Sequence, residues 1–370
     1  MMRICFYAPF KPIGHKHPSG DLVIATGLFE FLSRRGHSLR IASSLRTRWI
    51  FWKPWQFPYF LRERRRVVRQ CIRDHTELWF SYHSYYKGPD LLGPAVAGQA
   101  NIPYVIFQGV FSTKRKRDVR TWPGYILNKR ALCAAQHVFT NKQVDLRNLK
   151  RLLPLPRISY VAPGILPEDF TFNSNARKQL RNKLGLGDAP VVLSAAMFRP
   201  GVKTQGLEWV LQACGRLVQR GCRFNLLIAG DGKEKPRLLH LAEKNLGRRV
   251  HFVGKVSREK MHEFYSSGDL FVFPGIREGL GMVFLEAQSC GLPVVAFANE
   301  GIPEVVKDQV TGFLVPMYAA EPFDRAVEKL LSDQALRRKM GMTARKYVRD
   351  EHDLDKNYRE MESVLKQIVG

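Results

Sequence analysis

Residues 275–293 read G-I-R-E-G-L-G-M-V-F-L-E-A-Q-S-C-G-L-P and lie between two short apolar runs, at 270–273 and 294–297. Both runs are free of charge and have the length of strands that a parallel sheet buries on both faces. After its glycines, the stretch takes on the apolar spacing of a helix over residues 282–290. It therefore predicts a strand, a glycine loop, a helix and a second strand, which is the repeating unit of an α/β sheet.

This stretch holds two glutamates with seven residues between them. Glu278 falls in the predicted loop, and Glu286 falls about two turns into the predicted helix, on the side facing back towards the loop. Free N–H groups at a helix start attract anions, and glycines let a phosphate approach the backbone. The pattern indicates a site for a hydroxylated, phosphorylated ligand. The alternative for Glu286 is a structural role, as a cap or in an ion pair, because a carboxylate in an apolar helix needs a partner.

The length and composition of the chain bound its organisation. With 370 residues, of which 45% are apolar, two domains with ordinary cores are expected. No uncharged apolar run approaches the roughly 18 residues that a membrane span needs, and residues 1–8 read as a first strand rather than a secretory signal. The six cysteines form no C-x-x-C pair, so we expect buried free thiols in a reducing cytoplasm.

Positive charge is concentrated in the first half of the chain. The formal net charge is +26; residues 1–170 hold 28 Lys and Arg against 10 Asp and Glu, and the remaining 200 residues hold 31 against 23. A basic field of this size indicates an anionic partner, which could be a nucleic acid, an anionic membrane surface or a phosphorylated substrate. Charge alone does not choose among the three.

Strand and helix patterns alternate along the chain and predict two α/β domains of similar size. We expect residues 1–165 and 166–351 to form one doubly wound sheet each, and a helix at about 352–370 to pack back on the first domain. Pro163-Gly164 is interpreted as the hinge, and the strand and helix patterns restart after the polar, basic stretch 173–183. The first strand–helix turn holds a glycine loop at 9–20 but lacks G-x-G-x-x-G, which gives no support to a nicotinamide-dinucleotide site.

Residues 48–73 break the alternating pattern with a cluster of aromatic residues followed at once by arginines. Aromatic rings beside an arginine-rich helix suit a membrane interface, where rings lie at the headgroup level and arginines contact lipid phosphates. A second basic cluster at 114–117 fits the same surface. The alternative is a core-packing loop, a solvated basic helix and a solvated loop.

Four groups of the second domain would meet where the carboxyl ends of its strands converge. Arg199 and Lys203 follow the predicted strand 191–195, and two fixed cations there suit a diphosphate that must leave as an anion; two surface cations are the alternative. Gly230-Asp231-Gly232 is interpreted as a structural turn. The backbone near Val256 is a candidate contact for a nucleotide base, with a plain strand–helix turn as the alternative. The fourth group is the stretch with the two glutamates.

The residues of this half, their order and their spacing resemble glycosyltransferase family 4, whose members are retaining enzymes of the GT-B fold. The motifs that carry the resemblance are E-G-L-G-M-V-F-L-E (278–286), C-G-L-P-V-V (290–295), N-E-G-I-P-E-V-V (299–306), T-G-F-L-V-P (311–316) and A-G-D-G (229–232). Together they cover roughly Val191 to Pro316. The resemblance implies two Rossmann-like domains facing each other across a cleft, the first binding an acceptor and the second a nucleotide-diphosphate sugar.

The resemblance also implies roles for individual residues. Arg199 and Lys203 would bind the donor diphosphate and Glu278 the hydroxyls of the donor sugar, which makes these three the candidate catalytic residues. Glu286 would bind the ribose hydroxyls. The other candidate donor contacts are Gly20, Val256, Gly281, Met282 and Val283. Family members often carry a histidine after the strand that matches 104–107, where this chain has Gln108; Gln108 and His83 are candidate contacts of the sugar or acceptor.

The mechanism implied by the resemblance is front-face transfer with retention of configuration. Arg199, Lys203 and helix-end amides would assist departure of the nucleotide diphosphate, with UDP preferred over GDP. Neither a metal ion nor another cofactor is expected. The acceptor is expected to be a lipid-linked or envelope glycan, as in lipopolysaccharide, capsule or exopolysaccharide assembly. The protein would be cytoplasmic and peripheral on the inner face of the cell membrane.

Two other functions compete with this interpretation. A GT-B sugar-nucleotide epimerase or hydrolase would need an acid–base set around the sugar, and only Glu278 is a candidate for it. A basic nucleic-acid-binding protein would explain the charge, but the basic residues are not joined to any nucleic-acid motif, so no nucleic-acid partner is expected.

Overall fold

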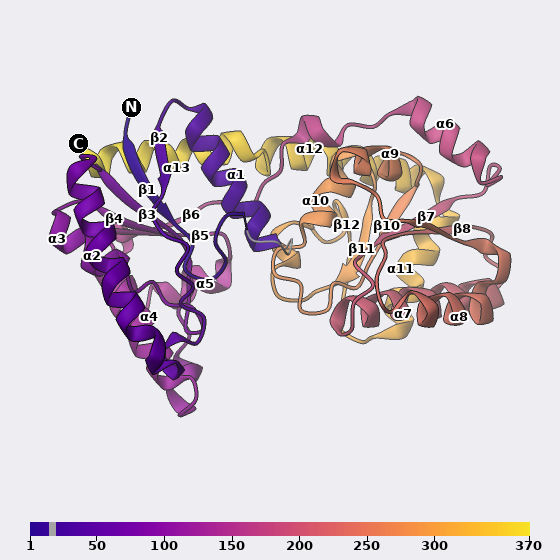
Figure 1. The fold of residues 1–370 in the computed structure, drawn as a ribbon. Coiled ribbons are helices and arrows are strands. Elements are labelled where there is room, and N and C mark those ends of the chain that lie inside the picture. Colours follow the sequence, from indigo (N-terminus) through magenta and orange to yellow (C-terminus); the bar gives the residue numbers. More distant parts are fainter. Residues whose placement is uncertain (15–19) are drawn as a thin grey trace. The chain divides into compact units, whose positions relative to one another are not determined.

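The computed structural model describes residues 1–14 and 20–370 and divides the chain into two units of closely contacting residues. Unit 1 consists of Met1–Ala162 and Asp355–Gly370, and unit 2 consists of Pro163–Leu354. The boundary expected from the sequence, between residues 165 and 166, lies close to this division. Each unit is built on its own parallel sheet (Figure 1).

Unit 1 is a six-stranded parallel sheet with the strand order β2-β1-β3-β4-β5-β6. Its strands are β1 (Arg3–Tyr7), β2 (Ser38–Ile41), β3 (Leu78–Ser84), β4 (Tyr104–Gly109), β5 (His137–Thr140) and β6 (Ile158–Tyr160). Its helices are α1 (Gly20–Arg34), α2 (Phe57–Arg73), α3 (Gly93–Ala100), α4 (Trp122–Ala134), α5 (Gln143–Leu149) and α13 (Leu354–Val369). The chain starts inside the sheet, moves to one edge and returns to extend the other, which is the doubly wound order.

Helices cover both faces of this sheet because successive side chains of a strand point to opposite faces. On the face of α1 and α13, Phe6 stacks on Phe80 with ring centroids 5.4 Å apart. On the same face Phe107 meets Tyr358 of α13 edge-on at 6.0 Å. On the opposite face, Trp79 belongs to a buried cluster that includes side chains of α2, α3 and α4. Figure 1 shows α13 and α1 on one side of the strands and α2 and α4 on the other.

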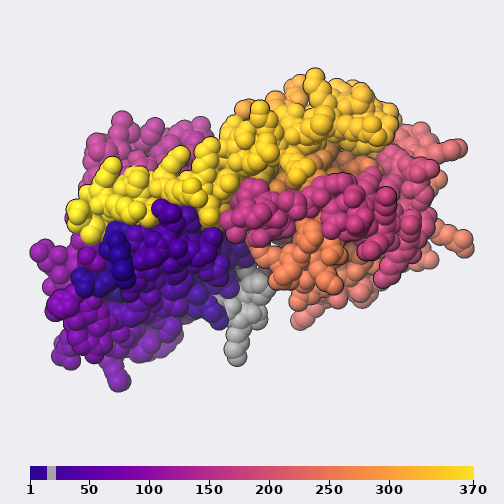
Figure 2. Space-filling view, turned by 90° about the horizontal axis from the view of Figure 1, so that it is seen from above, coloured from indigo at the N-terminus to yellow at the C-terminus, as the bar shows by residue number. Residues whose placement is uncertain are grey.

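The C-terminal helix α13 is held on unit 1 by charge as well as by apolar contact. The buried carboxylate of Glu362 accepts hydrogen bonds from Arg35 at 2.8 Å and lies 3.1 Å from the His37 ring and 2.6 Å from Lys366. Burial alone would raise the pKa of Glu362, but the hydrogen bonds from these partners lower it to about 2. Figure 2 shows this helix, in yellow, lying along the indigo N-terminal part of unit 1.

Unit 2 repeats the architecture with a six-stranded parallel sheet in the order β12-β11-β10-β7-β8-β9. Its strands are β7 (Val191–Ala195), β8 (Asn225–Ala229), β9 (Val250–Gly254), β10 (Leu270–Val272), β11 (Val294–Phe297) and β12 (Gly312–Val315). Its helices are α6 (Ser174–Lys183), α7 (Val202–Gln219), α8 (Lys235–Leu246), α9 (Met261–Ser266), α10 (Met282–Ser289), α11 (Ala320–Ser332) and α12 (Gln334–Glu351).

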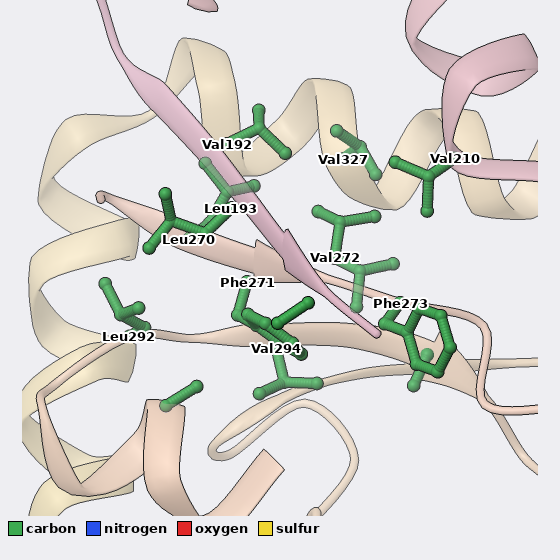
Figure 3. Close-up of a cluster of buried hydrophobic side chains, with 14 of the residues drawn as sticks. Val192, Leu193, Val210, Leu270, Phe271, Val272, Phe273, Leu292, Val294 and Val327 are labelled. Carbon is green, nitrogen blue, oxygen red and sulfur yellow. The ribbon is translucent and has the colours of Figure 1, made fainter. Parts of the chain in front are cut away.

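The core of unit 2 lies around the strands that the opening stretch predicted. Side chains of β10, β7 and β11 interdigitate there, and Val210 of α7 and Val327 of α11 close over them (Figure 3). Phe271 and Val294 are fully buried, as apolar runs flanked by helices on both faces should be. The expectation of strand, loop, helix and strand over residues 270–297 is confirmed.

The polar, basic stretch 173–183, for which no element was predicted, contains helix α6 over Ser174–Lys183. Asn173 caps this helix, accepting hydrogen bonds from the N–H groups of Asn175 and Ala176, both at 3.0 Å. Two of its arginines, Arg177 and Arg181, pair with Asp269 at 2.7 and 3.1 Å. Ion pairs replace the apolar stripe by which a helix is usually recognised in a sequence.

The six cysteines are all free, and the expectation that they are buried holds for four of them. Cys222 is half-buried and Cys133 is exposed. Cys5 on β1 and Cys71 on α2 lie with their Sγ atoms 3.4 Å apart.

Within residues 1–14 and 20–370, no helix combines the length and the apolar character that crossing a membrane demands.

Candidate functional site

The candidate donor residues of unit 2 follow the carboxyl ends of its strands. Arg199 and Lys203 come after β7, Val256 comes after β9, and Glu278 comes after β10. Strands β10, β7, β8 and β9 are consecutive in the sheet, so the loops that follow them emerge at one edge. The topology therefore brings the predicted residues to the edge where α/β sheets bind ligands.

Lys203 and Glu278 are in direct contact at this edge. Lys203 is the second residue of α7, and its Nζ forms an ion pair with Oε2 of Glu278. The same ammonium group lies 5.5 Å from the centroid of the Phe273 ring. The two side chains are 22% and 18% exposed, so the pair is accessible from solvent but partly shielded. Lys203 was expected at the diphosphate of a donor and Glu278 at its sugar, and their contact with each other was not predicted.

Arg199 offers a second cation, whose side chain is exposed. Its backbone is fixed, because its carbonyl accepts a hydrogen bond from Oγ of the buried Thr204 at 2.8 Å. Among the residues that the structure describes, no carboxylate lies within ion-pair distance of its guanidinium. Thr204 thus ties the start of α7 back to the loop that carries Arg199.

The A-G-D-G turn shapes the loop that carries Arg199. A Cβ on Gly230 would lie 1.9 Å from the Ala196 carbonyl oxygen, and one on Gly232 would lie 2.3 Å from the Phe198 carbonyl oxygen. The Phe198 N–H donates to the carbonyl of Asp231 at 3.0 Å. The structural role expected for this turn is therefore to support residues 196–199, and both glycines also have positive φ.

The start of α10 presents unpaired backbone donors. Gly281 precedes the helix with φ of 66°, and no side chain caps the helix at this end. The first N–H groups of a helix have no acceptor within it, and those of Gly281, Met282 and Val283 stand at this position. A Cβ on Gly281 would lie 2.4 Å from the Phe284 ring, so only glycine fits. The backbone geometry is that of an anion site.

Glu286 is buried, and the structure corrects its expected position. Because α10 begins at Met282, Glu286 lies about one turn into the helix rather than two. Its carboxylate accepts a hydrogen bond from the Tyr265 hydroxyl at 2.9 Å, and an Arg258 Nη atom lies 3.7 Å from its other oxygen. Burial raises the pKa of Glu286 despite these partners. The structure thus supplies the partners that a carboxylate in an apolar helix needs.

Fewer contacts define the surroundings of Val256 and Gly20 than those of the other candidate residues. Val256 is half-buried in the loop after β9, where Gly254 accepts a hydrogen bond from the Gly230 N–H at 2.8 Å. Gly20 is the first residue of α1. The glycine loop expected at 9–20 lies partly outside the described residues, and so does the contact expected between this loop and a diphosphate.

In unit 1, His83 and Gln108 end two neighbouring strands in unusual backbone conformations. Both have positive φ, 62° and 61°, which is rare outside glycine. The register pairs Tyr82 with Phe107 and Ser84 with Gly109, which places the two residues side by side. The side-chain oxygen of Gln108 is buried and accepts no hydrogen bond from any described residue. Strain of this kind collects at binding sites, where the fold enforces it.

The aromatic and basic segment 48–73 forms two short 3₁₀ turns followed by α2. Its exposed rings are Trp52, Trp55, Phe57 and Tyr59. An open groove of about 850 Å³ along α2 is lined by Arg62, Arg65, Arg66, Arg69 and Arg73. The Trp52 indole N–H donates to the carbonyl of Arg120 at 3.0 Å, which joins this segment to the loop that carries residues 114–117. Residues 48–73 and 114–117 are hereafter called the basic aromatic surface of unit 1.

Within residues 1–14 and 20–370, no three His, Cys, Asp or Glu side chains are grouped as a metal ion would require. An Asp-x-Asp sequence does occur at 353–355. Its Asp355 pairs with Arg34 at 3.0 Å.

Comparison with protein families and curated proteins points to one class. Residues 176–347 match the model described as "Glycosyl transferases group 1". Alpha-D-kanosaminyltransferase of Streptomyces kanamyceticus is 32% identical over 57% of this chain and 54% of its own length. GDP-mannose-dependent alpha-(1-6)-phosphatidylinositol monomannoside mannosyltransferase of Mycolicibacterium smegmatis is 31% identical over 57% of each. The matches span a little over half the length of these relatives.

Solved structures match the whole fold. Sucrose-phosphate synthase of Thermosynechococcus elongatus superposes with a TM-score of 0.76 and 20% identity, covering 99% of each chain. Anabaena HepE in complex with UDP gives 0.74 and 17% identity, covering 99% of this chain and 100% of that one. The expected α/β architecture of the GT-B type, with two Rossmann-like units, is confirmed.

Proposed function

Because residues 176–347 match the model of the glycosyl transferases group 1, we propose that this chain is a retaining glycosyltransferase that uses a nucleotide-diphosphate sugar. The observation that carries the proposal is the contact between Lys203 and Glu278. The exposed Arg199 and the uncapped start of α10 follow strands at the same sheet edge. Cations, amide donors and one carboxylate are the groups that a sugar diphosphate requires.

Each part of the nucleotide-sugar donor would have a binding partner in this arrangement. Arg199, Lys203 and the N–H groups at 281–283 would bind the diphosphate, and Glu278 would accept hydrogen bonds from the sugar hydroxyls. Lys203 would exchange the carboxylate of Glu278 for a phosphate oxygen when the donor arrives, which frees Glu278 for the sugar. Glu286 would accept from the ribose through Oε1, the oxygen that the Tyr265 hydroxyl does not bind, and Val256 would lie by the base.

The chemistry follows from charge placement. As the glycosidic bond to the diphosphate breaks, negative charge grows on the leaving oxygen, and fixed cations stabilise it without reorganising. We propose a front-face transfer, with Glu278 positioning the sugar rather than forming a covalent bond. Lys203, Arg199 and the amides supply the charge stabilisation, so we expect transfer to persist in excess EDTA.

The donor base and the acceptor belong to the proposal as well. One relative is named for GDP-mannose and one matched structure contains UDP; we keep UDP as the preferred nucleotide. We propose that unit 1 binds a lipid-linked or envelope glycan, with His83 and Gln108 contacting the sugar or acceptor. The basic aromatic surface supports a peripheral location at the inner face of the cell membrane, and one relative is named for a phosphatidylinositol-linked acceptor.

The test is turnover by the Glu278→Ala variant with a panel of UDP- and GDP-sugars, measured as release of the nucleotide diphosphate. We expect kcat to fall about 100- to 1,000-fold, the range for losing one electrostatic group aimed at a reacting centre. Glu263→Ala, an exposed glutamate on α9, is the matched control and should keep full activity. Unchanged turnover by Glu278→Ala, with the variant folded, would refute the assignment.

A further inference from the structure

A second charged pocket lies in unit 2, at the edge of the sheet opposite to the candidate donor site. It is an open pocket of about 210 Å³, lined by Arg177, Asp269, Gly291, Gln334, Arg337 and Arg338 among others. Asp269 directly precedes β10, and Gly291 lies just before β11. The pocket is therefore at the amino ends of these strands, whereas the candidate donor residues follow the carboxyl ends.

The one carboxylate in the pocket wall is already fully used. Its Oδ1 accepts from Arg177 at 2.7 Å, and its Oδ2 accepts from Arg181 at 3.1 Å and from the Val191 N–H at 2.7 Å. Two arginines therefore share the charge of Asp269, and both of its oxygens already accept hydrogen bonds.

Arg337 and Arg338 lack a counter-charge of their own. Arg337 is only 8% exposed, and its Nη1 donates to the backbone carbonyls of Leu330 and Leu331 at the end of α11. Among the described residues, neither Arg337 nor Arg338 has a carboxylate within ion-pair distance. Burial lowers the pKa of Arg337; the carboxylates of Asp269 and Asp333 act against this, and the like charges of Arg338 and Arg177 act with it. A buried cation whose hydrogen bonds go to neutral carbonyls, with no carboxylate at ion-pair distance, is costly.

We propose that this pocket binds a small oxyanion of the phosphate class, as the free ion or as a phosphate monoester. A phosphate would place oxygens beside the guanidinium groups of Arg337 and Arg338, with Arg177 adding positive charge from the pocket wall, and a guanidinium group suits the geometry of phosphate. The volume of about 210 Å³ falls below the roughly 300–1,000 Å³ of pockets for larger ligands, which favours a phosphate-sized group. The site is independent of the glycosyltransferase proposal, since it shares no residue with it.

The experiment measures the thermal unfolding midpoint of the full chain in rising sodium phosphate. Sodium chloride at equal ionic strength and pH is the reference, and glycerol 3-phosphate is a second probe. We expect a saturable rise of the midpoint with phosphate beyond the chloride reference. Arg338→Gln should raise the apparent dissociation constant at least tenfold, while leaving the fold intact, because Arg338 is exposed and makes no ion pair with the described residues.

Arg349→Gln, an exposed arginine further along α12, is the matched control and should respond as the wild type. A tighter response to glycerol 3-phosphate than to phosphate would assign the site to monoesters, and an equal or weaker one to the free ion. An equal phosphate response in wild type and Arg338→Gln would overturn the proposal. A rise that follows ionic strength alone, or one that Lys203→Ala abolishes while Arg338→Gln does not, would overturn it as well.

Discussion

Lys203 and Glu278 show how far residue-level reasoning from the sequence reaches. The spacing of the glutamates and the cations after a strand identified both residues as ligand groups, but their contact was not predictable. The contact depends on how the start of α7 packs against Phe273. A Cβ on Gly206 would lie 2.9 Å from the Phe273 ring, so glycine permits the close packing. Such packing is determined by the tertiary structure and leaves no periodic signal in the sequence.

The burial of Glu286 makes a pH-dependent prediction. Because its folded pKa is raised, the folded state holds this proton more tightly than the unfolded state, so ionisation removes stability as pH rises above about 4.5. Glu286→Gln removes that loss while the amide oxygen still accepts from Tyr265. We expect the unfolding midpoint of the variant, relative to wild type, to increase between pH 4 and pH 7. A relative midpoint that stays flat or falls would contradict the raised pKa.

At the scale of elements, the alternating apolar and polar runs predicted most strands and helices of both sheets. The strands β7 and β11 begin and end where the sequence predicted them, at 191–195 and 294–297, because they are apolar runs buried on both faces. Helix α6 was missed because ion pairs to Asp269 hold it. Strand β12 was noted only as the motif T-G-F-L-V-P, since its half-buried residues give a weak strand signal.

The anchoring of α13 gives an element-scale prediction. Glu362→Gln leaves Arg35, His37 and Lys366 without their shared carboxylate, and we expect unit 1 to lose about 2 kcal/mol of unfolding free energy at pH 7. Denaturant unfolding followed by tryptophan fluorescence suits this test, because five of the six tryptophans lie in unit 1.

The pH dependence of this loss has a definite sign. The depressed pKa of Glu362 means that its contribution is present above about pH 4.5 and fades as the pH falls towards 2, so wild type and variant should converge in acid. The exposed Glu360→Gln on the same helix is the control. A Glu362→Gln variant as stable as Glu360→Gln at pH 7 would show that the ion pairs do not anchor α13.

At the scale of the whole molecule, the excess of positive charge has a defined location. The basic aromatic surface predicts binding to vesicles that contain anionic lipid and not to neutral vesicles. Replacing Arg62, Arg65 and Arg69 by Gln should weaken that binding roughly 100-fold, since each basic residue at an anionic surface contributes about 1 kcal/mol. None of these three arginines is in an ion pair among the described residues, so the fold should be unaffected.

A matched variant separates local from total charge. Replacing the exposed Lys183, Arg248 and Lys260 of unit 2 by Gln removes the same net charge elsewhere. Sedimentation with liposomes at low and physiological salt is the measurement. Equal weakening by both triple variants would mean that total charge, not the basic aromatic surface, governs binding.

The central claim is that Lys203 and Glu278 mark the donor diphosphate site, and calorimetric titration of the chain with UDP and GDP tests it most directly. Lys203→Met keeps the apolar stem against Phe273 and removes the charge. We predict saturable nucleotide binding by wild type and by the exposed control Lys244→Met, and at least tenfold weaker binding by Lys203→Met, a loss of about 1.4 kcal/mol or more. Nucleotide binding by Lys203→Met equal to that of the control would contradict the account.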